Sequence, residues 1–170
     1  MISAAIAAML FAQEAAAPAA PRPAPPKCEG ETYEAFDFWV GEWEVFGPDG
    51  KKQANSRIEK VSAGCAIRET WMPLQGGGGT SSTAYDPKTG TWQQMWVGQV
   101  PGRIFFEGGP VDGKMILTGY WGKNREGKPT LIRMTYSTLD DGAVRQYGQA
   151  SVDHGLTWTD SFDLTYRPKE

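Results

Sequence analysis

Residues 80–98 read TSSTAYDPKTGTWQQMWVG, and this stretch decides the fold. In the run 91–98, Trp92, Gln94 and Trp96 recur at every second position, which is the periodicity of a β-strand with one buried face. The segment 86–90 (DPKTG) supplies an aspartate acceptor for turn amides and a glycine for positive φ. Because so short a connection forces antiparallel neighbours, the stretch predicts a β-hairpin.

The same pattern continues outward over most of the chain. Clusters of turn residues separate the alternating runs at 48–50, 86–90, 111–113, 124–127, 140–142 and 153–155. Such clusters are typical of hairpin connections, because Asp, Asn and Gly fit the backbone of tight turns. We therefore predict about ten strands, at 42–47, 52–62, 65–72, 80–86, 91–98, 102–108, 114–122, 130–138, 143–152 and 156–167.

Strands linked one after another by hairpins predict an all-β fold, either a sandwich or a single antiparallel up-and-down β-barrel. Closure removes the two edge strands that would otherwise invite aggregation, which favours the barrel. Ten strands leave more interior room than eight, which just hold side chains or one small ligand. The aromatic segment Tyr33–Trp39 is expected to form a short helical plug over one open end, or alternatively an irregular leader strand.

Composition bounds the classes of function. The chain has 170 residues, of which 40% are apolar and 12% aromatic, enough for one domain with its own core. Its net charge is -3, and no basic run occurs, so we expect no nucleic-acid partner. The sequence leaves the oligomeric state open.

The first thirty residues differ from the rest. Residues 1–12 (MISAAIAAMLFA) resemble a secretory signal peptide, and 13–30 form an Ala/Pro-rich tether ahead of the barrel domain 31–170. The apolar run is too short to remain as a membrane span, so we expect none in the mature protein. The expected location is periplasmic or secreted.

The two cysteines, Cys28 and Cys65, would meet an oxidising compartment after export. A disulfide between them would tie the tether to the third predicted strand. The alternative is a pair of unbonded thiols. Two cysteines without a nearby histidine cannot complete a tetrahedral zinc site, and we expect neither a metal nor a cofactor.

Several segments together resemble a family of uncharacterised bacterial exported proteins with lipocalin-like (calycin-like) barrels, a domain of unknown function. They are 36–43 (FDFWVGEW), 64–71 (GCAIRETW), 85–92 (YDPKTGTW), 151–158 (SVDHGLTW) and 162–167 (FDLTYR). The resemblance implies the barrel but no particular activity. Within it, residues 41–43 resemble the lipocalin G-x-W element, which implies that Trp43 closes the barrel base under a late-strand arginine, here Arg167.

Residues 151–158 also match the S-x-D-x-G-x-T-W hairpin of sialidase propellers, in which the aspartate caps turn amides and the tryptophan packs below. Asp153 and Trp158 are therefore expected to be structural, and one copy does not make a propeller. The motif places the single histidine, His154, at a hairpin tip, where it cannot hold haem inside the barrel. Gly76–Gly79 lacks the Lys-Ser/Thr of a phosphate loop and is interpreted as a flexible connection or a mobile lip over the barrel mouth.

Polar residues on apolar strand faces give the functional hypothesis. Glu69 and Arg133, if both point inward, must pair with each other or meet a ligand. Aromatic walls with few polar groups are typical of small-molecule sites. We predict that the barrel binds a small, mostly apolar molecule through Glu69, Trp71, Gln94, Trp96, Phe106, Arg133 and Tyr136. The alternatives are a cofactor-independent isomerase or hydrolase that uses Glu69 as acid or base, and a structural or envelope-interaction module without a ligand.

Overall fold

The computed structural model describes residues 27–169, which form an all-β barrel. The strands are β1 (Gly41–Phe46), β2 (Lys52–Val61), β3 (Ala66–Pro73), β4 (Gly79–Asp86), β5 (Thr91–Val97), β6 (Ile104–Val111), β7 (Lys114–Lys123), β8 (Pro129–Thr138), β9 (Val144–Ser151) and β10 (Thr159–Pro168). Each pairs antiparallel with its sequence neighbours, and β10 pairs with β1 to close the barrel. The predicted up-and-down barrel is confirmed.

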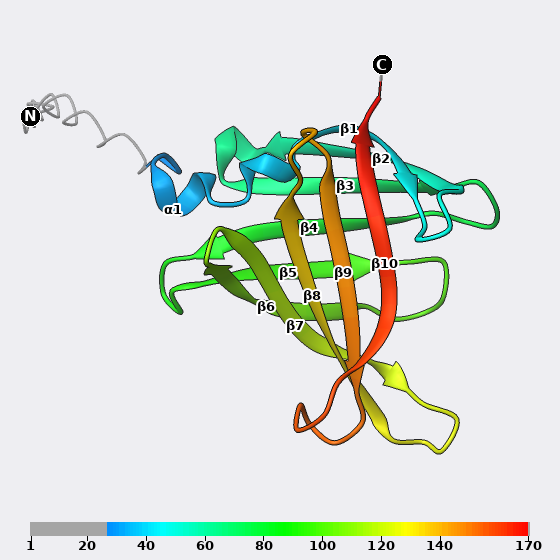
Figure 1. The fold of residues 1–170 in the computed structure, drawn as a ribbon. Helices are drawn as coiled ribbons and strands as arrows, with labels where there is room; N and C mark the ends of the chain where they lie inside the picture. Colours follow the sequence, from blue (N-terminus) through cyan, green and yellow to red (C-terminus); the bar gives the residue numbers. More distant parts are fainter. Residues whose placement is uncertain (1–26, 170) are drawn as a thin grey trace, which may run out of the picture.

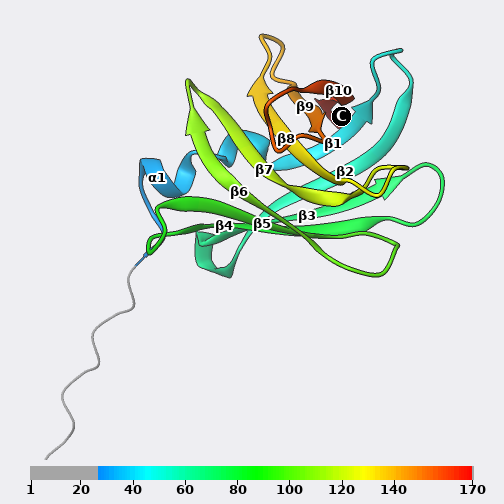
Figure 2. The ribbon, with the colours of Figure 1, turned by 90° about the horizontal axis from the view of Figure 1, so that it is seen from below.

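The strands wrap around a single interior. Figure 1 shows β8, β9 and β10 crossing steeply over β3, β4 and β5, and Figure 2 shows these two groups as opposite walls. Every predicted strand has a counterpart, displaced by at most three residues at either end. Turn chemistry explains this agreement, because the glycines at 50, 90, 113, 127 and 142 all have positive φ.

A short helical segment closes one end of the barrel, as predicted. It comprises α1 (Glu31–Glu34) and the 3-10 turn η1 (Asp37–Trp39), and together with Phe36 we call it the plug. Phe36 and Trp39 are both 0% exposed, and the ring centroid of each lies 4.9 Å from that of Tyr136 on β8. Burying two aromatic side chains of this size stabilises the plug by about 2 to 3 kcal/mol each.

Three further contacts fix the plug. The Trp43 indole donates its N–H to the carbonyl oxygen of Trp39 at 3.0 Å. Lys60 at the end of β2 forms an ion pair with Asp37 at 2.6 Å. Cys28 and Cys65 are joined in a disulfide, which ties the residues before α1 to the β2–β3 connection.

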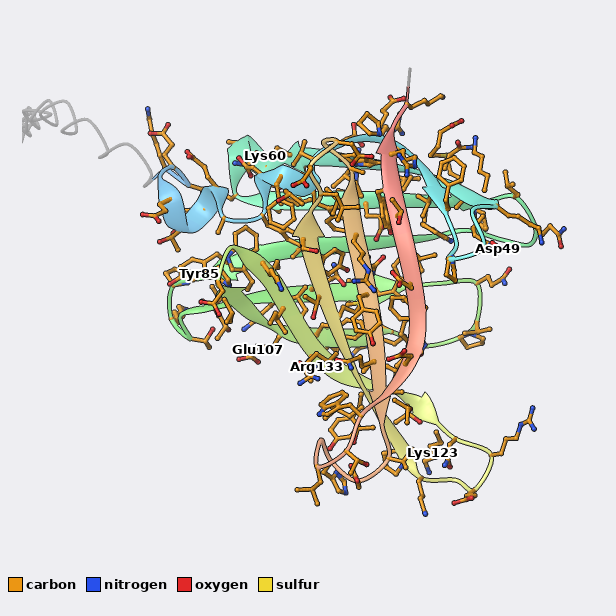
Figure 3. All side chains as sticks on the ribbon, viewed as in Figure 1. Asp49, Lys60, Tyr85, Glu107, Lys123 and Arg133 are labelled. Carbon is orange, nitrogen blue, oxygen red and sulfur yellow. A yellow bond between two sulfur atoms is a disulfide. The ribbon has the colours of Figure 1, made fainter. Side chains whose placement is uncertain are left out.

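The two ends of the barrel therefore differ. Lys60 and Tyr85 mark the plugged end in Figure 3, whereas Asp49 and Lys123 mark the opposite end. The connections at this opposite end, which we call the mouth, are residues 47–51, 74–78, 98–103, 124–128 and 152–158. The mouth thus carries Gly76–Gly78 and the S-x-D-x-G-x-T-W hairpin.

The expected stacking of Arg167 on Trp43 is wrong. Trp43 pairs with Pro168 and points inward, being 5% exposed. Arg167 pairs instead with Glu44 and points outward, because successive strand residues face opposite sides of the sheet. Its guanidinium reaches Asp141 at 2.9 Å. Trp43 is held by the plug backbone and not by an arginine.

The proposed signal peptide 1–12 and most of the proposed tether 13–30 lie outside the described residues. Within the part that the structure covers, 27–169, no helix is long and apolar enough to cross a membrane.

Candidate functional site

A cavity of about 190 Å³ lies inside the barrel between the plug and the mouth. Its lining residues come from β3 and from the six consecutive strands β5 to β10. The lining is mainly aromatic and consists of Glu69, Trp71, Gln94, Trp96, Phe106, Trp121, Met134, Tyr136, Gln146, Phe162, Leu164 and Tyr166.

The structure brings together six of the seven residues predicted to hold a ligand. Glu69, Trp71, Gln94, Trp96, Phe106 and Tyr136 all line the cavity. Arg133 does not, and its predicted inward direction is wrong. It lies on the outer face, where it donates to Gln149 at 2.7 Å and stacks over the ring of Trp158 at 4.1 Å from the centroid. Figure 3 labels Arg133 beside the group of strands β8, β9 and β10.

The error at Arg133 has a local cause. Alternation along the predicted strand 130–138 puts Arg133 on the same face as the apolar Leu131, but the inward residues of β8 are Ile132, Met134 and Tyr136, all buried. Leu131 is only half-buried, on the outside, close to Gly155 of the β9–β10 hairpin. The β9–β10 hairpin covers Leu131 on the outside of the barrel. An apolar residue at this position therefore does not mark the inner face of β8.

Strict alternation along the predicted strand 156–167 puts Trp158 on the same face as Phe162 and Leu164, and the structure shows that this is wrong. β10 begins at Thr159, and its pairing register with β9 shifts between Asp160 and Phe162. Such a β-bulge adds one residue to one strand and reverses the faces that follow. Trp158 therefore packs outside, on Arg133, while Phe162 and Leu164 line the cavity.

Glu69 is the one acidic side chain in the cavity wall, and it is 6% exposed. One carboxylate oxygen accepts from the Ser56 hydroxyl at 3.2 Å, and the other accepts from the Ser81 hydroxyl at 3.1 Å. No lysine, arginine or histidine lines the cavity, and no ion pair within residues 27–169 includes Glu69. The carboxyl is buried with neutral donors only.

Burial dominates the electrostatics of this carboxyl. Desolvation raises the pKa of Glu69 to about 7, against the opposing effect of hydrogen bonds from Ser81, Ser56 and Tyr166. Burial, followed by the nearby Glu69 charge, raises the pKa values of Tyr136 and Tyr166 well above the ordinary value. Both phenols therefore stay neutral near pH 7, where Glu69 alone exchanges a proton.

Hydrogen bonds also connect other polar groups of the cavity wall. Tyr166 donates to Gln146 Oε1 at 2.7 Å, and Gln146 Nε2 donates to the Tyr136 hydroxyl at 2.9 Å and approaches Met134 Sδ at 3.3 Å. Gln94 Nε2 donates to Thr83 at 3.0 Å. The Tyr166 hydroxyl and the Gln146 amide thus donate within the protein.

Six lining residues were not among the predicted ligand contacts. Phe162, Leu164 and Tyr166 alternate on β10, and Met134 stands two positions before Tyr136, so strand periodicity could have found them. Gln146 alternates with the apolar Val144, which is a weaker signal. Trp121 could not be assigned because it follows the exposed Tyr120 at the open end of β7.

Aromatic side chains surround the cavity on its mouth side. Trp121 is 41% exposed, and its ring lies 6.1 Å from that of Phe106. Phe162 lies over Gly148 of β9, where a Cβ atom would clash with the ring. The glycine therefore leaves the space that this ring occupies at the cavity wall.

The β9–β10 hairpin at the mouth is held by its own side chains. Asp153 accepts from the Thr157 backbone N–H at 2.9 Å, and the Trp158 indole donates to the Gly155 carbonyl at 3.0 Å. Hydrogen bonds from Ser151, then Thr157, lower the pKa of Asp153. His154 is exposed and bonds the Tyr120 hydroxyl at 2.7 Å, away from the cavity.

Comparison with known proteins adds no functional assignment: no family model matches the chain, and no curated protein matches it. Within residues 27–169, no cluster of three or more His, Cys, Asp or Glu side chains is arranged to hold a metal ion.

Proposed function

We propose that this chain is an exported, lipocalin-like protein that binds one small, mostly apolar molecule inside its barrel. The observation that carries this proposal is the aromatic cavity with a few buried polar groups at its wall. Small-molecule sites combine these two features, since apolar surface supplies affinity and isolated polar groups fix orientation. A structural module would need no such cavity.

The size of the cavity limits the ligand. Cavities for drug-sized ligands span roughly 300 to 1,000 Å³, whereas a cavity of about 150 Å³ holds benzene. At about 190 Å³, the present cavity matches a single ring with a short substituent. Trp96, Trp71 and Phe106 would contact the apolar body, and Glu69 and Gln94 would contact its polar group.

Cavity binding can be tested with 2-phenylethanol as a probe, by isothermal titration calorimetry and by tryptophan fluorescence. Leu164→Phe places a larger side chain in the cavity and should reduce the affinity at least tenfold. Thr165→Phe is the matched control, because the neighbouring residue points outward, and Arg133→Ala should also leave binding unchanged. No binding by the wild-type protein, or equal binding by the Leu164→Phe variant, would contradict the proposal.

Export is supported by the signal-like residues 1–12 and by the Cys28–Cys65 disulfide, since disulfides persist in oxidising compartments. Mass spectrometry of the protein from its own host tests this part. A mature chain lacking residues 1–12 in the periplasmic or secreted fraction is expected. An intact N-terminus in the cytoplasmic fraction would contradict it.

One observation favours catalysis as a second candidate. Glu69 has a pKa of about 7, is open to the cavity and contacts no cation, which suits a general acid or base. A cofactor-independent isomerase or hydrolase would lose turnover in Glu69→Gln while it kept its fold. A substrate that Glu69→Gln converts at the wild-type rate would exclude this role.

A further inference from the structure

The carboxylate of Glu69 is an acceptor that the cavity leaves available to a ligand. Tyr166 donates to Gln146, the Gln146 amide donates to Tyr136, and Gln94 donates to Thr83. Glu69 accepts hydrogen bonds from neutral hydroxyl groups only, and the two oxygens of a carboxylate can together accept about four. A ligand group placed against Glu69 must therefore bring a donor or a positive charge.

The charged side chains in and around the cavity also favour a ligand with positive charge. Glu69 is the only formally charged side chain in the lining, and the nearby arginines are committed outside the barrel. Arg133 bonds Gln149, Arg145 pairs with Asp163 at 2.7 Å, and Arg167 pairs with Asp141. A buried carboxylate without a cation is costly, so a ligand cation would offset the cost of its desolvation.

Aromatic residues of three strands, β3, β5 and β10, line the cavity together with the carboxyl. Trp71 follows Glu69 by two residues on the inner face of β3, and its ring lies 6.3 Å from that of Tyr166. Ser81, which bonds Glu69, pairs across the sheet with Trp96. Electron-rich ring faces beside a carboxylate are the arrangement that recognises organic ammonium groups.

On the basis of the proposed ligand-binding function, we infer that the ligand is an organic cation, a small aromatic or aliphatic body that carries one ammonium group placed against Glu69. Trp71, Trp96 and Tyr166 would contact the methylene or methyl groups next to the nitrogen. An anionic ligand would face Glu69 without any compensating charge, which excludes fatty acids and other carboxylates as the preferred class.

Titration of Glu69 makes the binding depend on pH. The groups that face its carboxyl are Ser56 of β2, Ser81 of β4, Tyr136 of β8 and Tyr166 of β10, and neither phenol ionises near neutral pH. With a pKa of about 7, Glu69 must lose its proton to bind a cation, so the affinity for an ammonium probe should rise about tenfold from pH 6 to pH 8.

The test compares three probes of the same size by calorimetry at pH 8: 2-phenylethylammonium, 2-phenylethanol and phenylacetate. We expect the ammonium to bind at least tenfold more tightly than the alcohol, and phenylacetate to bind most weakly. Glu69→Gln should remove the preference for the ammonium, so that the ammonium and the alcohol bind to the variant with similar affinity. Glu107→Gln, an exposed acid on the outer face that is labelled in Figure 3, is the matched control.

The outcomes separate the two proposals. Equal affinities for ammonium and alcohol, or a preference for phenylacetate, would overturn the inferred cation while the cavity still bound the alcohol in a Leu164→Phe-sensitive way. An ammonium preference that survived Glu69→Gln would also overturn it. Failure of all three probes to bind would overturn both proposals. Because glutamine is neutral and can keep the serine hydrogen bonds, Glu69→Gln is expected to fold, which thermal unfolding checks.

Discussion

At the scale of single residues, the protonation of Glu69 makes the unfolding free energy depend on pH, and the direction of this dependence follows from its pKa. Its pKa is raised from 4.5 to about 7 by folding, so the folded state binds the proton more tightly than the unfolded state. The contribution of Glu69 to the unfolding free energy is therefore fully present below pH 4.5 and is lost as pH rises to about 7. The shift corresponds to about 3 kcal/mol.

Glu69→Gln removes this titration and gives a measurable difference. The unfolding free energy of the variant minus that of the wild type should be about 3 kcal/mol larger at pH 8 than at pH 4.5, measured by urea unfolding. Changes in packing affect both pH values equally and cancel. Glu107→Gln should show no such difference. If the difference between the variant and the wild type were the same at both pH values, burial would not raise the pKa of Glu69.

At the scale of elements, the plug should contribute much of the stability at the closed end of the barrel. Trp39 is 0% exposed and packs on Tyr136, so Trp39→Ala should lower the unfolding free energy by about 3 to 5 kcal/mol. The same change at Trp121, which is 41% exposed at the mouth, should cost about 1 kcal/mol or less. Similar losses in both variants, measured by urea unfolding, would show that the plug is not part of the core.

The same scale shows what sequence periodicity can and cannot predict. Strand positions followed from the turns, because Asp and Gly at a connection impose the hairpin whatever packs around it. Strand faces followed only where one face is clearly apolar, as in β5. Leu131 and Trp158 misled the assignment because the hairpin folds back over the outer surface of β8 and the β-bulge reverses the phase of β10.

At the scale of the whole molecule, the disulfide joins positions 37 residues apart. Cys28→Ala/Cys65→Ala should lower the unfolding free energy by about 3 to 4 kcal/mol, because the unfolded chain regains the freedom of that loop. The circular dichroism of the folded barrel should stay the same. Chemical reduction should reproduce the loss in the wild type and have no effect on the double variant. An unchanged unfolding free energy would contradict the stabilising role of the bond.

The sequence favoured a closed barrel over a sandwich because closure removes two edge strands, but it could not predict the cavity. Whether inward side chains fill the interior depends on where each ring lies. Phe162, for example, occupies space that Gly148 leaves free, and Phe106 meets Trp121 at the open end. Such relations between distant strands are not present in the periodicity of any single strand.

Because one end of the barrel is closed and the other is open, the positions of the termini decide how the barrel can be attached to a surface. The described chain begins at the disulfide beside the plug and ends where the Lys169 backbone N–H bonds Glu42, so both termini of residues 27–169 lie at the closed pole. Immobilisation or fusion through either terminus would leave the opposite pole unobstructed, and the barrel would present its opening to the surrounding medium.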